Sequence, residues 1–231
     1  IKWINKTKNL KNLFVYAFCL SFLIIPLGTF ASSASLGGFV AADRANAKKV
    51  AQRRSIGSGT RSGCKNTFAK NSITLMVPES KVVHKTSNQT PSFYLRSANT
   101  SKTPLNFSLV NPEVSKPVIQ KSVTLSPGIN KIELPDEIKL VAGKMYLWYV
   151  AIPAVCENSA DSPQYQDVLT SSVEFTPAPH DLKNLLMNTE NETEKAKIYA
   201  ENGFWYDSLE ASVDHKSTFL KSLLKSVNLT I

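Results

Sequence analysis

The residues that could do chemistry in this sequence are few and scattered. The three histidines, His84, His180 and His215, lie far apart, and none has the spacing of a metal-binding pair. The sequence contains no glycine-rich phosphate-binding loop, no G-x-S-x-G and no H-E-x-x-H. We therefore predict no metal, no cofactor and no catalytic residues, and we expect a protein that is not an enzyme.

Two pairs of carboxylates offer alternatives. Asp161 and Asp167 lie in one predicted loop, whose oxygens could bind calcium, but the alternating ligands of a calcium loop are missing. Glu201 and Asp207 flank a predicted helical turn with aromatic residues between them, which would suit a sugar site. A solvated turn that Trp205 anchors is the simpler interpretation. The turn still supplies the candidate binding surface: Asn202, Gly203, Phe204, Trp205, Tyr206 and Asp207.

The three cysteines indicate the redox compartment. Cys19 lies inside an apolar N-terminal run, which leaves Cys64 and Cys156 as a pair once that run is removed. In an exported chain such a pair predicts a disulfide bond. The bond would close a loop of roughly 90 residues and stabilise the fold by about 4–5 kcal/mol, less any strain. Two unrelated buried thiols are the alternative.

The N-terminus has the layout of a secretory signal peptide. Lysines precede the unbroken apolar run Leu13–Ile25, and the small residues that lead up to Ala34 suit cleavage there. The run is shorter than the roughly 18–20 residues of a membrane span, and an uncleaved anchor is the alternative. Residues 1–34 are therefore the predicted signal peptide. We expect a periplasmic or secreted protein that contacts the membrane only through this segment when it is uncleaved.

The positive charge of the chain lies ahead of the predicted folded region. The net charge is +9, of which residues 1–34 contribute +4 and residues 35–62 contribute +5. Residues 63–231 hold 17 basic and 17 acidic side chains. Residues 35–62 are small, basic and polar, which predicts a flexible tether, with an arm for an anionic surface as the alternative. The balanced remainder gives no reason to expect nucleic-acid binding.

Seven short runs predict strands within residues 63–177. They are Ile73–Val77, Ser92–Arg96, Leu105–Val110, Val118–Leu125, Ile129–Leu134, Met145–Val155 and Val168–Phe175. Met145–Val155 is apolar on both faces, which is typical of a central strand that is covered on both sides, with Trp148 in or beside the core. The spacing favours a mainly β fold, an immunoglobulin/fibronectin-like antiparallel β-sandwich.

Beyond the last predicted strand the apolar period becomes helical. Asp181–Met187 predicts one apolar turn. Thr189 and Glu192 have the spacing of a capping box ahead of a helix, and Asn202-Gly203 ends that helix. Phe204–Val213 begins a second helix. Residues 178–231 are therefore predicted to form a C-terminal α-helical hairpin that packs on the sandwich.

Several blocks of sequence together resemble a known family. The blocks are Gly63-Cys64, Leu75-x-Val77-Pro78-Glu79, Pro91-Ser92-Phe93-Tyr94, Pro127-Gly128-Ile129, Gly143-Lys144-x-Tyr146-x-Trp148-Tyr149 and Tyr199-Ala200-Glu201-Asn202-Gly203-Phe204-Trp205-Tyr206-Asp207. With the signal-like N-terminus and the basic tether, they are similar to the cyanobacterial domain of unknown function 928 family, over about Cys64 to Leu209. The resemblance implies a secreted or periplasmic cyanobacterial protein, and it carries over no catalytic residues.

The expected function is binding. An intact core pattern without a convergent polar set predicts an exported, non-enzymatic binding protein whose partner is an envelope protein or a glycan. An envelope-polymer hydrolase that uses loop carboxylates is one alternative, and a purely structural envelope component is another.

Overall fold

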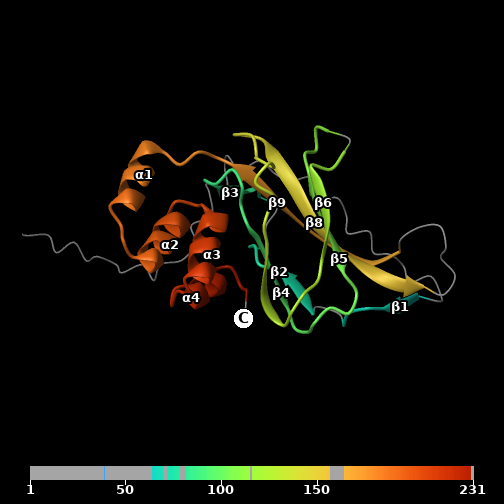
Figure 1. The fold of residues 1–231 in the computed structure, drawn as a ribbon. Coiled ribbons are helices and arrows are strands. Elements are labelled where there is room, and N and C mark those ends of the chain that lie inside the picture. Colours follow the sequence, from blue (N-terminus) through green and yellow to red (C-terminus); the bar gives the residue numbers. More distant parts are fainter. Residues whose placement is uncertain are drawn as a thin grey trace, which may run out of the picture. The chain divides into compact units, whose positions relative to one another are not determined.

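The computed structural model describes Phe39 and residues 64–69, 72–78, 82–114, 116–156 and 164–229. All of them belong to one unit, Ala34–Ile231. The predicted signal peptide and, apart from Phe39, the predicted tether lie outside the described residues. Within the described residues the chain is mainly β, with nine strands in two sheets and four helices (Figure 1).

The larger sheet is built around the long apolar strand β8 (Met145–Cys156). Its neighbours are β5 (Leu105–Val110) and β9 (Tyr165–Phe175), both antiparallel to it, and Figure 1 shows β8 and β9 side by side. β6 (Ile119–Val123) extends the sheet beyond β5, and β1 (Cys64–Asn66) pairs with the end of β8. The central position predicted for this strand is confirmed.

One edge of the larger sheet departs from the antiparallel arrangement that the sequence predicts. β3 (His84–Thr86) pairs with β9 in parallel. A parallel pair needs a long connection between its strands, and here β4 to β8 all lie between β3 and β9 along the chain. The prediction missed β1 and β3 because three residues are too few to show a hydrophobic period.

The smaller sheet has the order β2 (Ile73–Leu75), β4 (Phe93–Ser97), β7 (Gly128–Ile132). β7 forms one edge, as predicted, with Ile132 buried and Lys131 on the opposite face. Each of the seven predicted runs overlaps a strand of the structure. The immunoglobulin- or fibronectin-like topology stays a prediction.

The two faces of β8 differ in burial. Trp148 and Val150, on one face, are almost completely buried. Phe93 from the smaller sheet covers this face, with its ring centroid 4.9 Å from that of Trp148. Leu147 and Tyr149, on the other face, are only half-buried. The second face is therefore less completely covered than predicted, although Ala151 on this face is buried.

In the described part of the chain, four helices follow the sheets instead of a single hairpin, and Figure 1 shows them gathered on the side where β3 lies. They are α1 (His180–Met187), α2 (Glu192–Glu201), α3 (Trp205–Asp214) and α4 (Leu220–Ser226). Asn191 caps α2, because its side chain accepts the Glu194 N–H at 3.1 Å. The predicted capping residue, Thr189, instead donates its hydroxyl to the Leu185 carbonyl. In the described part of the chain, no helix combines the length and apolarity of a membrane span.

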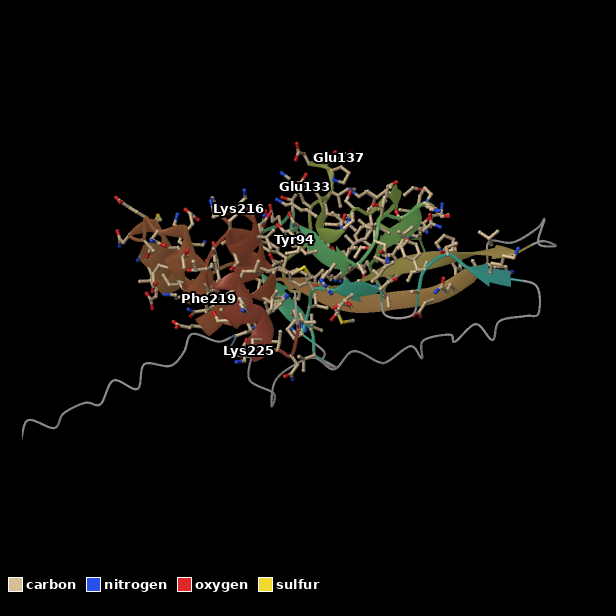
Figure 2. The ribbon with its side chains drawn as sticks, turned by 90° about the horizontal axis from the view of Figure 1, so that it is seen from below. Tyr94, Glu133, Glu137, Lys216, Phe219 and Lys225 are labelled. Carbon is tan, nitrogen blue, oxygen red and sulfur yellow. The ribbon has the colours of Figure 1, made fainter. Side chains whose placement is uncertain are left out.

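Sheets and helices share one hydrophobic core. Trp205 and Leu209 of α3 belong to the same buried cluster as Phe93 and Trp148 of the sheets. Figure 2 places Tyr94 where the strands meet the helical segment. Phe39, within the predicted tether, packs edge-on against Trp205 with ring centroids 5.1 Å apart. The tether is therefore not solvated at this residue.

The predicted cysteine pair lies on two neighbouring strands. The register of β1 and β8 places Cys64 directly opposite Cys156. The side chains of both residues lie outside those that the structure describes.

Candidate functional site

Most of the predicted binding surface, Asn202–Asp207, lies inside the protein. Asn202 is exposed, but the five residues from Gly203 to Asp207 are all buried, and Trp205 is 0% exposed. These residues turn the chain from α2 into α3. Trp205 and Tyr206 enter the shared core, and Phe204 packs in a smaller cluster with Leu182 and Ile198. The segment therefore holds the helices in place, and as buried side chains its residues cannot offer a surface to a partner.

Trp205 and Tyr206 of this segment form hydrogen bonds to residues of the β-sheet region through their polar atoms. The Trp205 indole donates to the Met76 carbonyl at 3.0 Å. The Trp148 indole donates to the Tyr206 hydroxyl at 2.8 Å, and that hydroxyl donates to the Ser172 carbonyl at 2.8 Å. Burial raises the pKa of Tyr206 above its usual range, so the phenol stays neutral. Each buried polar tip thus has a partner, as aromatic residues in a core require.

Asp207 fixes the loop that follows β3. Its carboxylate accepts the Ser87 backbone N–H at 2.9 Å and the Ser87 hydroxyl at 2.5 Å. Burial raises the pKa of Asp207 to about 6, although these hydrogen bonds act to lower it. Glu201, its predicted partner in an acid pair, is exposed at the end of α2. One carboxylate is enclosed and the other faces solvent, so the two do not form an open acidic cleft.

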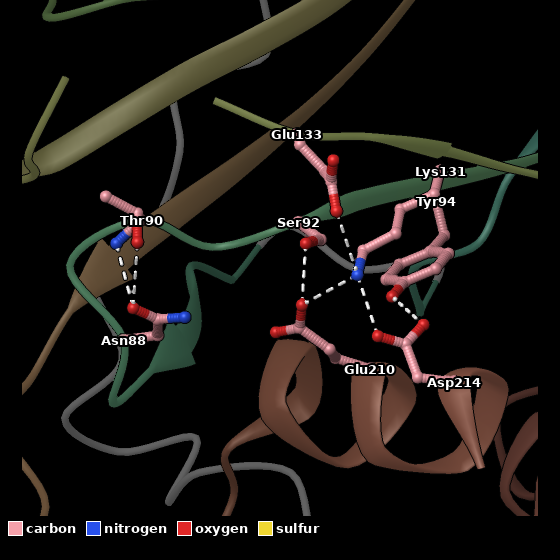
Figure 3. A network of polar contacts seen from close by, with 8 residues as sticks. All are labelled: Asn88, Thr90, Ser92, Tyr94, Lys131, Glu133, Glu210 and Asp214. Atoms are coloured by element: carbon pink, nitrogen blue, oxygen red, sulfur yellow. Dashed lines mark hydrogen bonds and ion pairs between the residues drawn. The ribbon is translucent and has the colours of Figure 1, made fainter. Parts of the chain in front are cut away.

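A charged network joins α3 to the smaller sheet, as Figure 3 shows. The Lys131 ammonium lies 2.7 Å from Asp214 and 3.3 Å from Glu210, both on α3. It also lies 3.1 Å from Glu133, next to β7. The Tyr94 hydroxyl donates to Asp214 at 3.0 Å. One lysine therefore ties together carboxylates from two parts of the fold.

The protonation states of this network are fixed near neutral pH. Partial burial acts to lower the pKa of Lys131, but hydrogen bonds to Asp214 and Glu133 outweigh it and raise the pKa. Burial, and then the charges of Glu210 and Asp214, raise the pKa of Tyr94. Lys131 stays charged and Tyr94 stays neutral, so neither exchanges a proton readily. We interpret the network as a structural clamp between the helices and the smaller sheet.

The outward face of the larger sheet carries a hollow of about 510 Å³, which we call the sheet hollow. Residues directly opposite each other on antiparallel strands share a face, so the register defines two rows across β9, β8, β5 and β6. One row consists of Thr170, Tyr149, Ser108 and Gln120, and the other consists of Val168, Ala151, Asn106 and Ser122. All of them except Thr170 line the hollow, and Tyr165 and Lys121 complete the lining.

Small side chains form the floor of the sheet hollow and large ones its walls. Ala151 and Ser108 are 5% and 2% exposed, on the two central strands. Tyr149 and Tyr165 are half-buried beside them. The hollow therefore results from small residues flanked by aromatic ones, an arrangement that leaves ring surface accessible to a ligand.

Two neutral side-chain amides of the sheet hollow are available to a ligand. Within the described part of the protein, the side-chain amides of Asn106 and Gln120 have no hydrogen-bond partner. Ser122 is exposed beside them. Among the described residues of the lining, Lys121 is the one that carries a charge, and its ammonium donates to the Glu133 carbonyl. The described lining thus presents hydroxyl and amide groups without an acidic residue.

The other residues that could do chemistry do not assemble. Within the described residues, no group of three or more histidine, cysteine, aspartate or glutamate side chains is placed to bind a metal ion. His84 is buried, and this burial lowers its pKa to about 4, whereas His180 and His215 are exposed. The Asp167 carboxylate accepts the next backbone N–H at 2.8 Å. Asp161 lies outside the described residues.

Sequence reasoning did not find the sheet hollow. Asn106 and Ser108 alternate with buried apolar residues of β5, a pattern that indicates only a solvent face. The signal that sets this face apart is Tyr149 opposite Ser108, but recognising it requires the strand order and register. Both arise from pairing between distant segments, which a single sequence does not specify.

A family model matches most of the chain. The model of the family described as Domain of Unknown Function (DUF928) matches residues 56–230, which include every strand and helix of the structure. A search of curated proteins found no match.

Proposed function

We propose that this chain, which belongs to the family described as Domain of Unknown Function (DUF928), is an exported, non-enzymatic protein that binds a neutral glycan in the sheet hollow. The observation that carries the proposal is the combination of Tyr149 and Tyr165 with the amides of Asn106 and Gln120 around a floor of small side chains. Between the two partners expected from the sequence, an envelope glycan suits this hollow better than an envelope protein.

The chemistry of a saccharide matches that of the lining. One face of a sugar ring presents C–H groups, which pack on the face of an aromatic ring such as Tyr149 or Tyr165. Its hydroxyl groups both donate and accept hydrogen bonds, as do the amides of Asn106 and Gln120. Neighbouring strands lie about 4.8 Å apart, so successive polar side chains across β8, β5 and β6 recur at a spacing comparable to a sugar ring.

The charge of the sheet hollow supports binding rather than hydrolysis. Glycoside hydrolysis normally needs two carboxyl groups about 5–10 Å apart on either side of the scissile bond. No aspartate or glutamate is among the described residues that line the hollow. A neutral ligand also fits, because the single lysine is already hydrogen-bonded to a backbone carbonyl.

Affinity electrophoresis of the purified chain in gels that contain laminarin or hydroxyethyl cellulose tests the proposal. The wild-type chain is expected to be retarded by at least one of these neutral glucans. Tyr149→Ala and Asn106→Ala should each weaken binding about tenfold or more, since each removes a stacking surface or a two-way hydrogen-bonding group. Thr170→Ala, on the same sheet face but outside the hollow, is the matched control and should bind like wild type.

The rival functions give different results in the same samples. Release of reducing ends from either glucan would indicate the hydrolase. Self-association in sedimentation, together with no retardation of the wild-type chain, would favour a structural envelope component. Retardation that Tyr149→Ala leaves unchanged would place glycan binding outside the sheet hollow.

We further propose that the mature chain is an exported product of a cyanobacterium and carries a disulfide between Cys64 and Cys156. Directly opposite residues of an antiparallel pair have Cα atoms about 4.5–5.5 Å apart, within the range that a disulfide spans. Non-reducing mass spectrometry of the exported protein should show the two cysteines linked, and N-terminal sequencing should begin near Ser35. Two free thiols would contradict the first expectation, and a start at Ile1 in membrane fractions would contradict the second.

A further inference from the structure

A second hollow, of about 710 Å³, lies beside the helices, and we call it the loop hollow. It is lined by the loop after β3 (residues 87–90), the loop before β8, the chain just after β9, and helices α1 and α2. It shares no lining residue with the sheet hollow. Ser87, whose hydroxyl and N–H bind the buried Asp207, stands at one side of it.

The loop hollow combines an apolar wall with two positive charges. Phe175 and Leu186 line it, and Met187 beside them is 75% exposed. Lys139 and Lys183 also line it, and within the described part of the protein neither has an ion-pair partner. No acidic residue is part of the described lining. The complementary ligand is therefore apolar and carries a negative charge.

The loop at residues 87–90 is held in a fixed conformation. The Asn88 side chain accepts the Thr90 N–H at 3.0 Å and the Thr90 hydroxyl at 3.2 Å, which Figure 3 shows. The Gln89 carbonyl accepts a backbone N–H from the loop before β8 at 2.9 Å. Within the described part of the chain, the Gln89 N–H has no partner. A rigid loop with a free backbone donor loses little entropy when it binds an extended peptide.

We propose that the loop hollow binds the C-terminal end of a partner polypeptide whose last side chains are apolar, with its α-carboxylate paired to Lys139 and Lys183. The apolar side chains would pack on Phe175, Leu186 and Met187. A membrane surface fits less well, because electrostatic binding to anionic lipid usually takes clusters of four to eight basic residues, and the hollow is concave. The inference is independent of the sheet hollow, and together the two sites would link a protein to a glycan.

Selection from a phage library that displays random heptapeptides with free C-termini tests the inference. The full chain is expected to enrich peptides that end in apolar residues. In fluorescence polarisation, an enriched peptide should bind Lys139→Glu/Lys183→Glu at least tenfold more weakly than wild type, and its C-terminally amidated form should lose affinity similarly. Lys102→Glu/Lys221→Glu changes the net charge equally at exposed sites away from the hollow and should leave the affinity unchanged.

Two further variants separate the possible outcomes. Met187→Gln, at an exposed position, should weaken peptide binding severalfold without affecting folding, whereas Tyr149→Ala in the sheet hollow should leave it unchanged. Failure to enrich any peptide, or equal binding of the free and amidated forms, would overturn the inference. Binding to phosphatidylglycerol vesicles that depends on Lys139 and Lys183, without peptide binding, would overturn it in favour of a membrane surface.

Discussion

Two regions of the molecule are rich in polar groups: the junction between the helices and the sheets, and the sheet hollow. The two regions differ in whether these groups have partners within the protein. At the junction, the Trp148 indole donates to Tyr206, and Lys131 contacts three carboxylates. In the sheet hollow, the amides of Asn106 and Gln120 have no partner within the described residues. Since an enclosed polar group without a partner is costly, these junction groups are paired within the protein, whereas the half-open hollow can leave groups free for a ligand.

The difference sets the last of the family-like blocks, Tyr199–Asp207, apart from the surface that we propose to be functional, to which Tyr149 of another family-like block belongs. Trp205, Tyr206 and Asp207 of that last block hold the fold together from the inside. A sequence block that resembles a family can therefore report a packing constraint rather than a binding site. If this is right, substitutions at the junction should change stability, and substitutions in the hollow should change glycan binding.

The largest effect is expected for Trp205→Ala. Trp205 is 0% exposed and its indole satisfies the Met76 carbonyl, so the substitution leaves a cavity and an unpaired buried acceptor. We expect the free energy of unfolding to fall by about 3–5 kcal/mol, measured by urea denaturation. Tyr149→Ala, which also removes a large aromatic side chain but from a half-buried position, should cost less than about 1 kcal/mol. Equal losses of unfolding free energy in the two variants would contradict the difference between the junction and the sheet hollow.

A pH effect of opposite sign is expected at two buried groups of the junction. Burial raises the pKa of Asp207 from 3.8 to about 6, so the folded state holds a proton that the unfolded chain has lost. The stability from this proton is present below about pH 4 and is lost as pH rises through about 6. Burial lowers the pKa of His84 from 6.5 to about 4, so its contribution is present above about pH 6.5 and is lost as pH falls towards 4.

Differences between variants isolate these two groups from the other titrating residues. From pH 4 to 6.5, the unfolding free energy of wild type relative to Asp207→Asn should fall by about 2 kcal/mol. Relative to His84→Gln it should rise by a similar amount over the same range. Chemical denaturation at half-unit pH steps checks both slopes, and glycan binding by either variant should match wild type wherever the protein is folded. A slope of the same sign for both variants would contradict the assigned burial.

The strands were predictable because their side chains carry a local period. Leu105, Phe107 and Leu109 alternate along β5, and the run from Met145 is long and apolar, so both strands follow from the sequence. β3 is three residues long, and its parallel pairing with β9 depends on a partner about 90 residues away. No local pattern encodes that contact.

The site was less predictable than the fold, for the same reason. The aromatic and acidic residues from Trp205 to Asp207 look like a binding surface because they are large, polar-tipped and adjacent. Their burial follows from the way α3 packs on the sheets, which a helical period alone does not specify. Tyr149, whose pattern suggested a buried face, is half-exposed beside Ala151 and lines the sheet hollow. Which face of a two-sided apolar strand is covered depends on the second sheet.

The smallest effect is expected at the edge of the junction, where the clamp meets solvent. Lys131 is 29% exposed and Asp214 is 36% exposed, so solvent screens the network and Lys131→Gln should cost only about 1 kcal/mol of unfolding free energy. The cost should shrink in 0.5 M salt, because screening shortens the range of charge interactions to about 4 Å. Gln120→Ala in the sheet hollow is the matched comparison, and it should leave stability unchanged at both salt concentrations while weakening glycan binding regardless of salt. If Lys131→Gln lowered the unfolding free energy by more than about 3 kcal/mol regardless of salt, this edge of the junction would behave like a closed core. If the same variant lost glycan binding, the junction and the sheet hollow would be coupled.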